Sequence, residues 1–448
     1  MLKKLCYIIF VYIFLLLCLV QKASAIALIT DDEIESSLKK LATPLLLAAN
    51  INPNNISIRL VQDKSANAFV ADNKNIFLNT GLLLAFSDTP EAILGILAHE
   101  IGHIKAGHLL RNQEKLSQVR KATITSLILA TAAAVAGGNP DGVAAAVIGS
   151  SHIGEREMLR HSRENEETAD QIAVTLLKKI NISPQGLVKV LEYFKQRELA
   201  SYDSINPYTL THPISRERLT FIRNYLHNLN YSPVSISPAI KESFMRSMKK
   251  LKAFLEPSDI TLNSTPSNDS INDIYARAIA LFKLPDLKKA INLMKILTTR
   301  EPNNPYFLEF TGQILFENGH IQDSIKYYEN AHKLLPKALG IKLGLSIALI
   351  ASTDNNHHIH NSANLNQAIS YLKQVLEQED DNLLALRSLA IAYGRQGQIG
   401  IANAILANIA LLNGNAQEAI KFAKLASNQL PKNHPYMFKV KDILNSVK

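Results

Sequence analysis

Residues 91–104 read Glu-Ala-Ile-Leu-Gly-Ile-Leu-Ala-His-Glu-Ile-Gly-His-Ile, and the rest of the chain is interpreted from the five residues 99–103 at the centre of this stretch. On a helix, His99 and His103 share one face, close enough for both imidazoles to bind one zinc ion. Glu100 lies about 100° further round, beside the position that such an ion leaves open. The spacing therefore predicts a helix that presents a metal site with a carboxylate base.

The same helix carries an apolar face. Ile93, Leu97, Ile101 and Ile104 recur at helical spacing, which predicts that the helix is buried. The alternative interpretation is a core helix with two partly exposed histidines and no metal. A third ligand elsewhere in the chain would favour the metal site.

A second helical stretch supplies that ligand. Residues 162–170 read Ser-Arg-Glu-Asn-Glu-Glu-Thr-Ala-Asp, and apolar residues follow at helical spacing. Glu166 and Asp170 lie on one face of this helix. If it crosses the first helix, Glu166 becomes the third ligand of a His₂Glu site, and Asp170 orients a ligating imidazole. The sequence predicts one zinc ion per chain.

The composition is that of a folded protein with two or three domains, because 448 residues contain 47% hydrophobic and 19% charged side chains. The formal net charge is +9, and its lysines and arginines are spread along the chain. The densest run, residues 246–252, is interpreted as a solvated helix face. We therefore expect no nucleic-acid partner.

Residues 1–25 have the three parts of a secretory signal peptide: Lys3 and Lys4, an apolar run, and Ala23-Ser-Ala25. Export would remove both cysteines and lower the net charge to +6. A retained membrane anchor is the alternative.

Three short strands are predicted between the first helix, residues 31–49, and the metal helix. They cover residues 56–61, 66–71 and 76–80. Residues 74–80 are the predicted edge strand, which would bind an extended substrate through its backbone. An ordinary structural hairpin is the alternative.

Residues 123–149 form two uncharged, alanine-rich arms around a turn. Neither arm is long enough to span a bilayer. We expect a helical hairpin that covers the site, and the alternative is a segment that contacts a membrane surface.

The last part of the chain is repetitive. Ala278, Ala290, Met294 and Pro302 are matched 34 residues later by Gly312, Ser324, Tyr328 and Pro336, and this is the period of tetratricopeptide repeats. Residues 231–272 are rich in proline, serine and asparagine, which predicts a linker with one short helix. The predicted fold is an α+β zincin-type metallopeptidase domain (26–230), this linker (231–272) and an all-α repeat solenoid (273–448).

Five motifs occur in the order found in HtpX-like zinc metallopeptidases, and the chain resembles this family from about residue 28 to 229. They are Asn67-Ala-Phe, Asn79-Thr-Gly-Leu-Leu83, Ala98-His-Glu-Ile-Gly-His103, Ser162-Arg-x-x-Glu-x-x-Ala-Asp170, and Thr211-His-Pro213 with Arg218. The resemblance implies that His99, His103 and Glu166 hold zinc and that Glu100 is the general base. It also implies that His212 and Arg218 are catalytic residues at the rim of the site. Family members commonly have a glycine in the turn where this chain has Asp72-Asn-Lys74.

A peptidase domain joined to repeats resembles the BepA group of periplasmic proteases in Gram-negative bacteria. This resemblance implies a periplasmic endopeptidase that acts in the quality control of outer-membrane proteins. Its substrates would be unfolded or misassembled proteins, and the repeats would bind the outer-membrane assembly machinery. Two other functions stay open: a chaperone or assembly factor with a structural zinc, and a peptidase in peripheral contact with a membrane.

Overall fold

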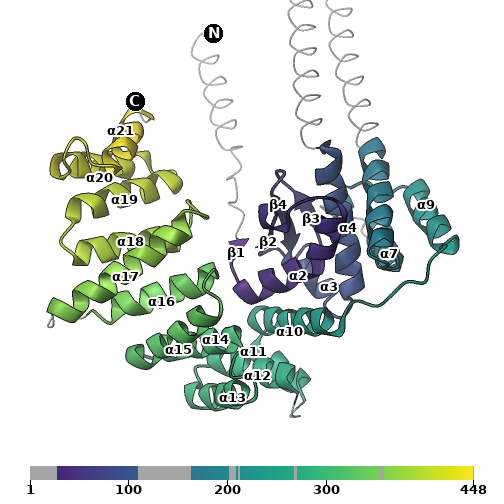
Figure 1. Cartoon of the computed structure of the whole chain (residues 1–448), viewed down its shortest axis with the longest axis horizontal. Helices are drawn as coiled ribbons and strands as arrows, with labels where there is room; N and C mark the ends of the chain where they lie inside the picture. Colours follow the sequence, from purple (N-terminus) through teal and green to yellow (C-terminus); the bar gives the residue numbers. More distant parts are fainter. Residues whose placement is uncertain are drawn as a thin grey trace, which may run out of the picture.

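The computed structural model describes residues 28–108, 163–200, 208–209, 212–266, 270–353 and 358–446 (Figure 1). The predicted signal peptide and the predicted hairpin of residues 123–149 lie outside these ranges. The described part begins with an α+β domain and ends with an all-helical one, as the sequence predicts.

The α+β domain contains a four-stranded mixed sheet in the order β1-β2-β4-β3. The strands are β1 (Leu28–Ile29), β2 (Ser57–Val61), β3 (Ala68–Val70) and β4 (Asn75–Asn79). β2 pairs in parallel with β4, whereas β1 pairs antiparallel with β2 and β3 with β4. The three predicted strands are thus present.

The prediction that residues 74–80 form the edge of the sheet is wrong, because β4 lies between β2 and β3. A tight turn folds β3 back onto one side of β4 and leaves the other side for β2. The turn needs no glycine, since Asp72 Oδ1 accepts hydrogen bonds from the backbone N–H groups of Lys74 (2.7 Å) and Asn75 (2.6 Å). The free edge near the metal helix is therefore β3.

Helices pack on this sheet and on one another. They are α2 (Asp32–Ala48), the short 3₁₀ helix η1 (Pro53–Asn55), α3 (Thr80–Ala85), α4 (Pro90–Ala106), a helix over residues 163–179, α7 (Gln185–Ala200) and α9 (Arg216–His227). Asp31 caps α2 by accepting hydrogen bonds from the N–H groups of Glu33 and Ile34. No helix in the described ranges is long and apolar enough to cross a bilayer.

Two helices, α10 (Pro238–Leu255) and α11 (Ser258–Ser264), occupy the stretch predicted to be a linker with one short helix. Phe244, Met248 and Leu251 of α10 belong to the core of the α+β domain, whereas Ala253 belongs to the first core of the repeats. The linker prediction was wrong, because these apolar residues recur at helical spacing and bury α10 although the stretch is rich in proline and serine. α10 connects two cores.

The prediction of a solvated basic face on α10 is also wrong for two of its residues. Lys250 is 4% exposed, and its Nζ lies 2.8 Å from Asp31 Oδ2 and 3.3 Å from Glu33 Oε2. Arg246 contacts Glu33 and Glu301. The acidic first turn of α2 attracts these cations, and the sequence of α10 alone gives no sign of that contact.

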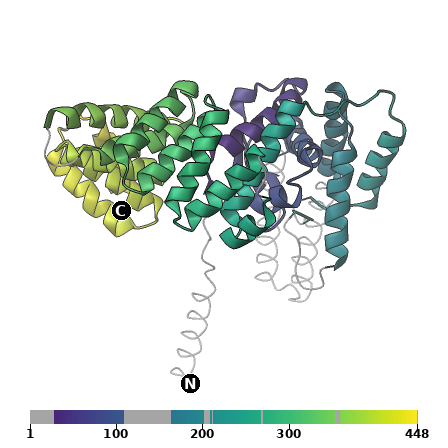
Figure 2. The ribbon, with the colours of Figure 1, turned by 90° about the horizontal axis from the view of Figure 1, so that it is seen from below.

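The repeat helices form a curved row beside the α+β domain (Figures 1 and 2). α12, α14 and α16 begin at residues 271, 305 and 339, so the 34-residue period is present in the structure. The ten helices described here are α12 (Ile271–Lys283), α13 (Leu287–Arg300), α14 (Pro305–Glu317), α15 (Ile321–Leu334), α16 (Leu339–Ala351), α17 (His358–Leu376), α18 (Leu383–Arg395), α19 (Ile399–Leu412), α20 (Ala416–Gln429) and α21 (Tyr436–Ser446).

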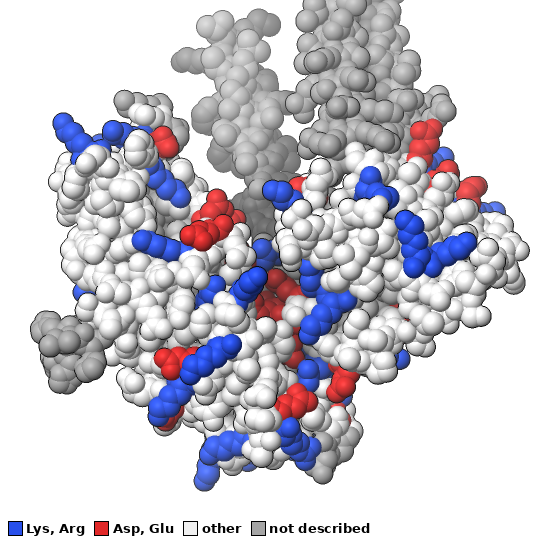
Figure 3. Space-filling view, in the orientation of Figure 1, with Lys and Arg blue, Asp and Glu red and all other residues white. Residues whose placement is uncertain are grey.

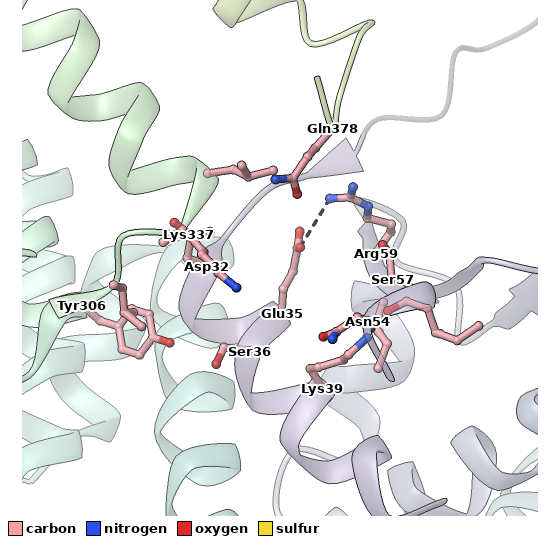
Figure 4. Close-up of a pocket in the computed structure, with 15 residues that line it drawn as sticks. Asp32, Glu35, Ser36, Lys39, Asn54, Ser57, Arg59, Tyr306, Lys337 and Gln378 are labelled. Atoms are coloured by element: carbon pink, nitrogen blue, oxygen red, sulfur yellow. Dashed lines mark hydrogen bonds and ion pairs between the residues drawn. The ribbon is translucent and has the colours of Figure 1, made fainter. Parts of the chain in front are cut away.

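Polar contacts join the repeats to the α+β domain around a cavity of about 410 Å³ (Figure 4). The backbone N–H of Ile341, in the first turn of α16, donates to Asp32 Oδ2 at 2.9 Å. Arg59 of β2 lies 2.6 Å from Glu379 and 3.4 Å from Glu35. Acidic side chains accordingly gather in the hollow between the two parts, next to lysines and arginines (Figure 3).

Candidate metal centre

The predicted metal helix is α4, and a proline and a glycine mark its two ends. Pro90 occupies its first turn, where a missing N–H costs nothing, and Gly107 ends it in the left-handed conformation at φ 65°. His99 and Glu100 are fully buried, and His103 is 9% exposed. The apolar face of the helix packs into the core as predicted.

Gly102 brings the second helix close to α4. A Cβ atom at this position would lie 2.7 Å from the carbonyl oxygen of Ala169, so only glycine permits this approach of helix 163–179. The contact places Glu166 and Asp170, on either side of Ala169, against the two histidines. This role of Gly102 was not predicted, although a glycine between two metal ligands on a helix is a signal that points to it.

Four side chains converge at this crossing: His99, His103, Glu166 and His212. His99 Nε2 lies 3.0 Å from His103 Nε2 and 3.2 Å from Glu166 Oε2. His103 Nε2 lies 3.2 Å from Glu166 Oε1, and His212 Nδ1 lies 3.2 Å from both oxygens of Glu166. A tetrahedral ion with ligand bonds of about 2.0–2.1 Å has ligand-to-ligand distances of about 3.3–3.4 Å. The donor set therefore fits a metal ion of that size.

Asp170 fixes the orientation of one imidazole. His99 Nδ1–H donates to Asp170 Oδ1 at 2.9 Å, which leaves the lone pair of Nε2 directed at the cluster. Asp170 is fully buried. Burial alone would raise the pKa of its carboxyl, but Arg218 and His99 hold it below the usual value.

Arg218 lies behind the cluster, not at its rim as the family resemblance implies. It is 2% exposed, its Nε donates to Asp170 Oδ2 at 2.6 Å, and its Nη2 donates to Asp170 Oδ1 at 3.0 Å. Its Nη1 also lies 2.9 Å from Glu166 Oε2. Arg218 thus contacts both Glu166, which belongs to the cluster, and Asp170, which orients His99, and it is a positioning residue.

His212 was predicted at the rim and lies within the cluster. It is 5% exposed, and its ring stacks on Tyr208 at 4.7 Å between centroids. Its Nδ1 faces Glu166, while its Nε2 is 3.7 Å from Glu100 Oε1. The geometry makes its Nδ1 a fourth possible ligand atom. The stacking partner Tyr208, four residues earlier, was missed by the sequence analysis.

Glu100 is buried beside the cluster with both carboxylate oxygens free of hydrogen bonds to any described residue. Its neighbour is His212 Nε2, at 3.7 Å from Oε1. A buried carboxylate without a donor is unfavourable in a closed core, whereas it is suited to accept a proton from a small molecule bound at the cluster.

The cluster has a strong internal field. Burial alone would lower the pKa of His99, but without a metal ion the carboxylates of Asp170 and Glu166 outweigh this effect and raise it to about 10. A metal ion at Nε2 would therefore displace a proton from this imidazole. In the same way, burial would raise the pKa of Glu166, but the neighbouring histidines hold it well below its usual value. Glu166 is therefore ionised and matches a cation.

Two histidines one turn apart, a carboxylate between them and a glutamate from a second helix define a metallopeptidase of the His-Glu-x-x-His class. Residues 29–226 match Peptidase family M48, and residues 275–338 match the Tetratricopeptide repeat. The chain thus contains an M48 peptidase domain followed by tetratricopeptide repeats.

Several proteins are similar to this chain over about two thirds of its length. The Beta-barrel assembly-enhancing protease of Yersinia pestis is 25% identical over 319 residues, which cover 69% of this chain and 64% of that protein. The protein of the same name from Escherichia coli (strain K12) is 24% identical over 312 residues, which cover 68% of this chain and 63% of that protein. The chain therefore spans less than two thirds of the length of these relatives.

Shorter matches cover one part of the chain. Metalloprotease YcaL of Escherichia coli (strain K12) is 29% identical over 180 residues, or 40% of this chain and 65% of that protein. A solved thermophilic TPR protein from Thermus thermophilus matches 39% of this chain and 100% of its own, at 17% identity and a TM-score of 0.27.

Proposed function

We propose that the protein is a zinc-dependent endopeptidase in which Glu100 is the general base. One observation carries this proposal: the buried carboxylate of Glu100, which accepts no hydrogen bond from any described residue, lies beside a cluster of three imidazoles and a glutamate. A merely structural zinc site has no need for such a base.

Each residue of the site has a distinct role in this proposal. His99, His103 and Glu166 would hold the zinc ion, with His212 Nδ1 as a further ligand atom in this conformation. When bound, zinc supplies Lewis acidity for water and for the peptide carbonyl. Glu100 accepts the proton of the attacking water and returns it to the leaving amine. Asp170, itself held by Arg218, keeps the His99 imidazole oriented throughout.

An extended substrate has a place to bind. β3 pairs with β4 on one side only among the described strands, and it packs against α4. Its outer edge therefore offers backbone N–H and C=O groups next to the catalytic helix, and a substrate added as a further strand would present a peptide bond to the site.

We further propose that the protein acts in the periplasm on unfolded or misassembled outer-membrane proteins, and that its repeats bind the assembly machinery of these proteins. The names of two relatives, both beta-barrel assembly-enhancing proteases, support this role. So does a repeat domain large enough to hold a partner beside the peptidase domain.

The test is cleavage of casein and of a misfolded porin by the purified full chain, with zinc content measured on the same samples. Glu100→Gln keeps the shape of the side chain but cannot accept the proton, so we expect zinc to stay bound while cleavage falls by at least about 10³-fold, in the range of large losses of general-base and electrostatic catalysis. Glu167→Gln, an exposed carboxylate on helix 163–179, is the matched control and should cleave normally. Cleavage by Glu100→Gln at the rate of the wild type would contradict the assignment.

A further inference from the structure

A second cavity lies far along the repeats from the metal centre. It has a volume of about 420 Å³ and lies between α17, α18, α19 and the start of α21. The volume is in the range of pockets that bind small ligands or side chains. Nothing in the peptidase mechanism uses it.

The wall of this cavity is mostly apolar. Leu386 and Leu389 of α18 and Ile405 of α19 line it and are each at most 5% exposed. Pro435 and Tyr436 close it at the start of α21. Such a surface favours an apolar side chain over water.

One polar group interrupts this wall. Asn408 lines the cavity and is 6% exposed, and its side-chain amide makes no hydrogen bond with any residue that the structure describes. An amide carries both donors and an acceptor, and those of Asn408 are available to a ligand in the cavity. A ligand with an apolar body and one hydroxyl would satisfy it.

The rim carries charges of both signs. Lys373, Glu377 and Asp380 come from the end of α17 and the turn after it, and Lys439 comes from α21 on the other side. Within the described residues, Glu377, Asp380 and Lys439 form no ion pair. The rim is therefore able to pair with charges that flank a buried side chain.

The apolar surface continues beyond the cavity. Leu412 lies one turn after Asn408 on the same face of α19 and is 46% exposed. A small molecule that filled the cavity would leave this side chain in water, whereas a peptide would cover it. The extended surface and the charged rim thus favour a polypeptide.

We propose that this cavity and its charged rim, together called the groove, bind a segment of a partner protein through a tyrosine side chain. The ring of the tyrosine would fill the apolar cavity and its hydroxyl would exchange hydrogen bonds with the Asn408 amide. Acidic and basic residues on its two sides would pair with Lys439 and with Glu377 and Asp380. This site is independent of the metal centre and of peptide hydrolysis.

The experiment measures binding of fluorescent peptides, each about a dozen residues long, to the full chain by anisotropy. The peptides have a lysine-rich half, a glutamate-rich half and a central tyrosine, phenylalanine or alanine. We expect the tyrosine peptide to bind at least tenfold more tightly than the alanine peptide and more tightly than the phenylalanine peptide. If the tyrosine and alanine peptides bind alike, or if none of them binds, the proposal is wrong.

Two variants locate the site. Asn408→Leu should remove the preference for tyrosine over phenylalanine while the phenylalanine peptide still binds. Lys439→Glu should weaken all charged peptides, whereas Lys424→Glu, the same charge change at an exposed position of α20, should not. Circular dichroism and zinc content verify that each variant is folded. Unchanged binding by both groove variants would overturn the proposal. It would also be overturned if analytical ultracentrifugation showed a dimer of the wild type that the groove variants do not form, because a second copy would then be the occupant.

Discussion

At the scale of single residues, the metal cluster depends on a side chain that touches no substrate. Arg218 binds Asp170 through two nitrogens and reaches Glu166 with a third. A guanidinium makes this bidentate contact, whereas a lysine ammonium does not. The position therefore requires arginine for geometry as well as for charge.

We predict that Arg218→Lys lowers zinc affinity by about 10–100-fold, the range for residues that orient metal ligands. The variant keeps the positive charge. However, Asp170 is no longer held in one orientation, so its hydrogen bond no longer fixes the His99 imidazole. A competition titration with a chromogenic chelator measures the change. Arg216→Lys, an exposed arginine on the same helix, is the control. Equal affinity of Arg218→Lys and wild type would show that Asp170 needs no such support.

A second residue-scale prediction concerns the junction with the repeats. Burial raises the pKa of Glu35 to about 8, against the partial opposition of Arg59. The folded protein thus keeps a proton that the unfolded chain, with a pKa near 4.5, releases. Because the pKa is raised on folding, this contribution to stability is complete below about pH 4.5 and is lost as the pH rises through 8.

Glu35→Gln removes that titration, so its melting temperature should fall less than that of the wild type between about pH 6 and pH 9. Differential scanning calorimetry at several pH values gives the two slopes. The exposed Glu167→Gln should follow the wild type. Parallel slopes for Glu35→Gln and wild type would mean that Glu35 is already ionised at the junction.

At the scale of elements, the crossing of α4 and helix 163–179 determines how the side chains that would hold the metal are arranged. The carbonyl oxygen of Ala169 occupies the space where a side chain at Gly102 would begin, at 2.7 Å from its Cβ. We predict that Gly102→Ala pushes the two helices apart, lowers zinc affinity and destabilises the domain by about 1–3 kcal/mol, as overpacking does.

The repeats offer a matched control. Gly394 lies in α18, and a Cβ there would meet nothing within 4 Å. Gly394→Ala should therefore raise stability by up to about 1 kcal/mol through helix propensity. If both substitutions stabilise the protein, the contact between Gly102 and Ala169 does not limit how closely the two helices pack. Chemical denaturation and the chelator titration together measure the outcomes.

Elements also show what could be predicted from the sequence. The spacing of His99, His103 and Glu166 is local to two helices, and helical periodicity alone places these residues on the correct faces. The sheet order and the burial of Arg218 and Lys250 depend on contacts between segments far apart in the chain. No local pattern encodes such contacts, and the edge strand, the rim position and the solvated basic face were accordingly predicted wrongly.

At the scale of the whole molecule, the peptidase domain and the repeats are joined by more than a connecting segment. Asp32 accepts from the first turn of α16, whose N-cap residue Ala338 forms no side-chain cap of its own. Arg59 and Glu379 pair across the junction at 2.6 Å. The first turn of α2 thus serves as a cap for a repeat helix.

We predict that Arg59→Glu loosens this junction, because it places a third carboxylate beside Glu35 and Glu379. Small-angle scattering should show a larger radius of gyration, and proteolysis should cleave faster between the two parts. The double variant Arg59→Glu with Glu379→Arg should restore the wild-type values, since the pair is reversed. A double variant no better than the single one would show that the pair contributes little to docking.

The last prediction is that the peptidase domain survives without its repeats but at lower stability. All the residues proposed to hold zinc precede residue 219, so truncation after Pro257 leaves the metal cluster and α10 in place. However, it removes Tyr275, whose hydroxyl donates to the buried Glu33 at 3.1 Å, and it exposes the side of α10 that packs on α12. A hydrogen bond of this kind contributes about 0.5–1.5 kcal/mol, since Lys250 stays 3.3 Å from the same Glu33 oxygen in the truncated chain. We therefore expect full zinc content and casein cleavage at room temperature, together with a melting temperature several degrees below that of the full chain.

The full chain with Tyr275→Phe is the control. It should reproduce part of the loss of stability, because this variant removes only the hydroxyl. A truncated protein without zinc would mean that the two parts fold as one unit through α10, and the proposed boundary between peptidase and repeats would then have no independent meaning for folding.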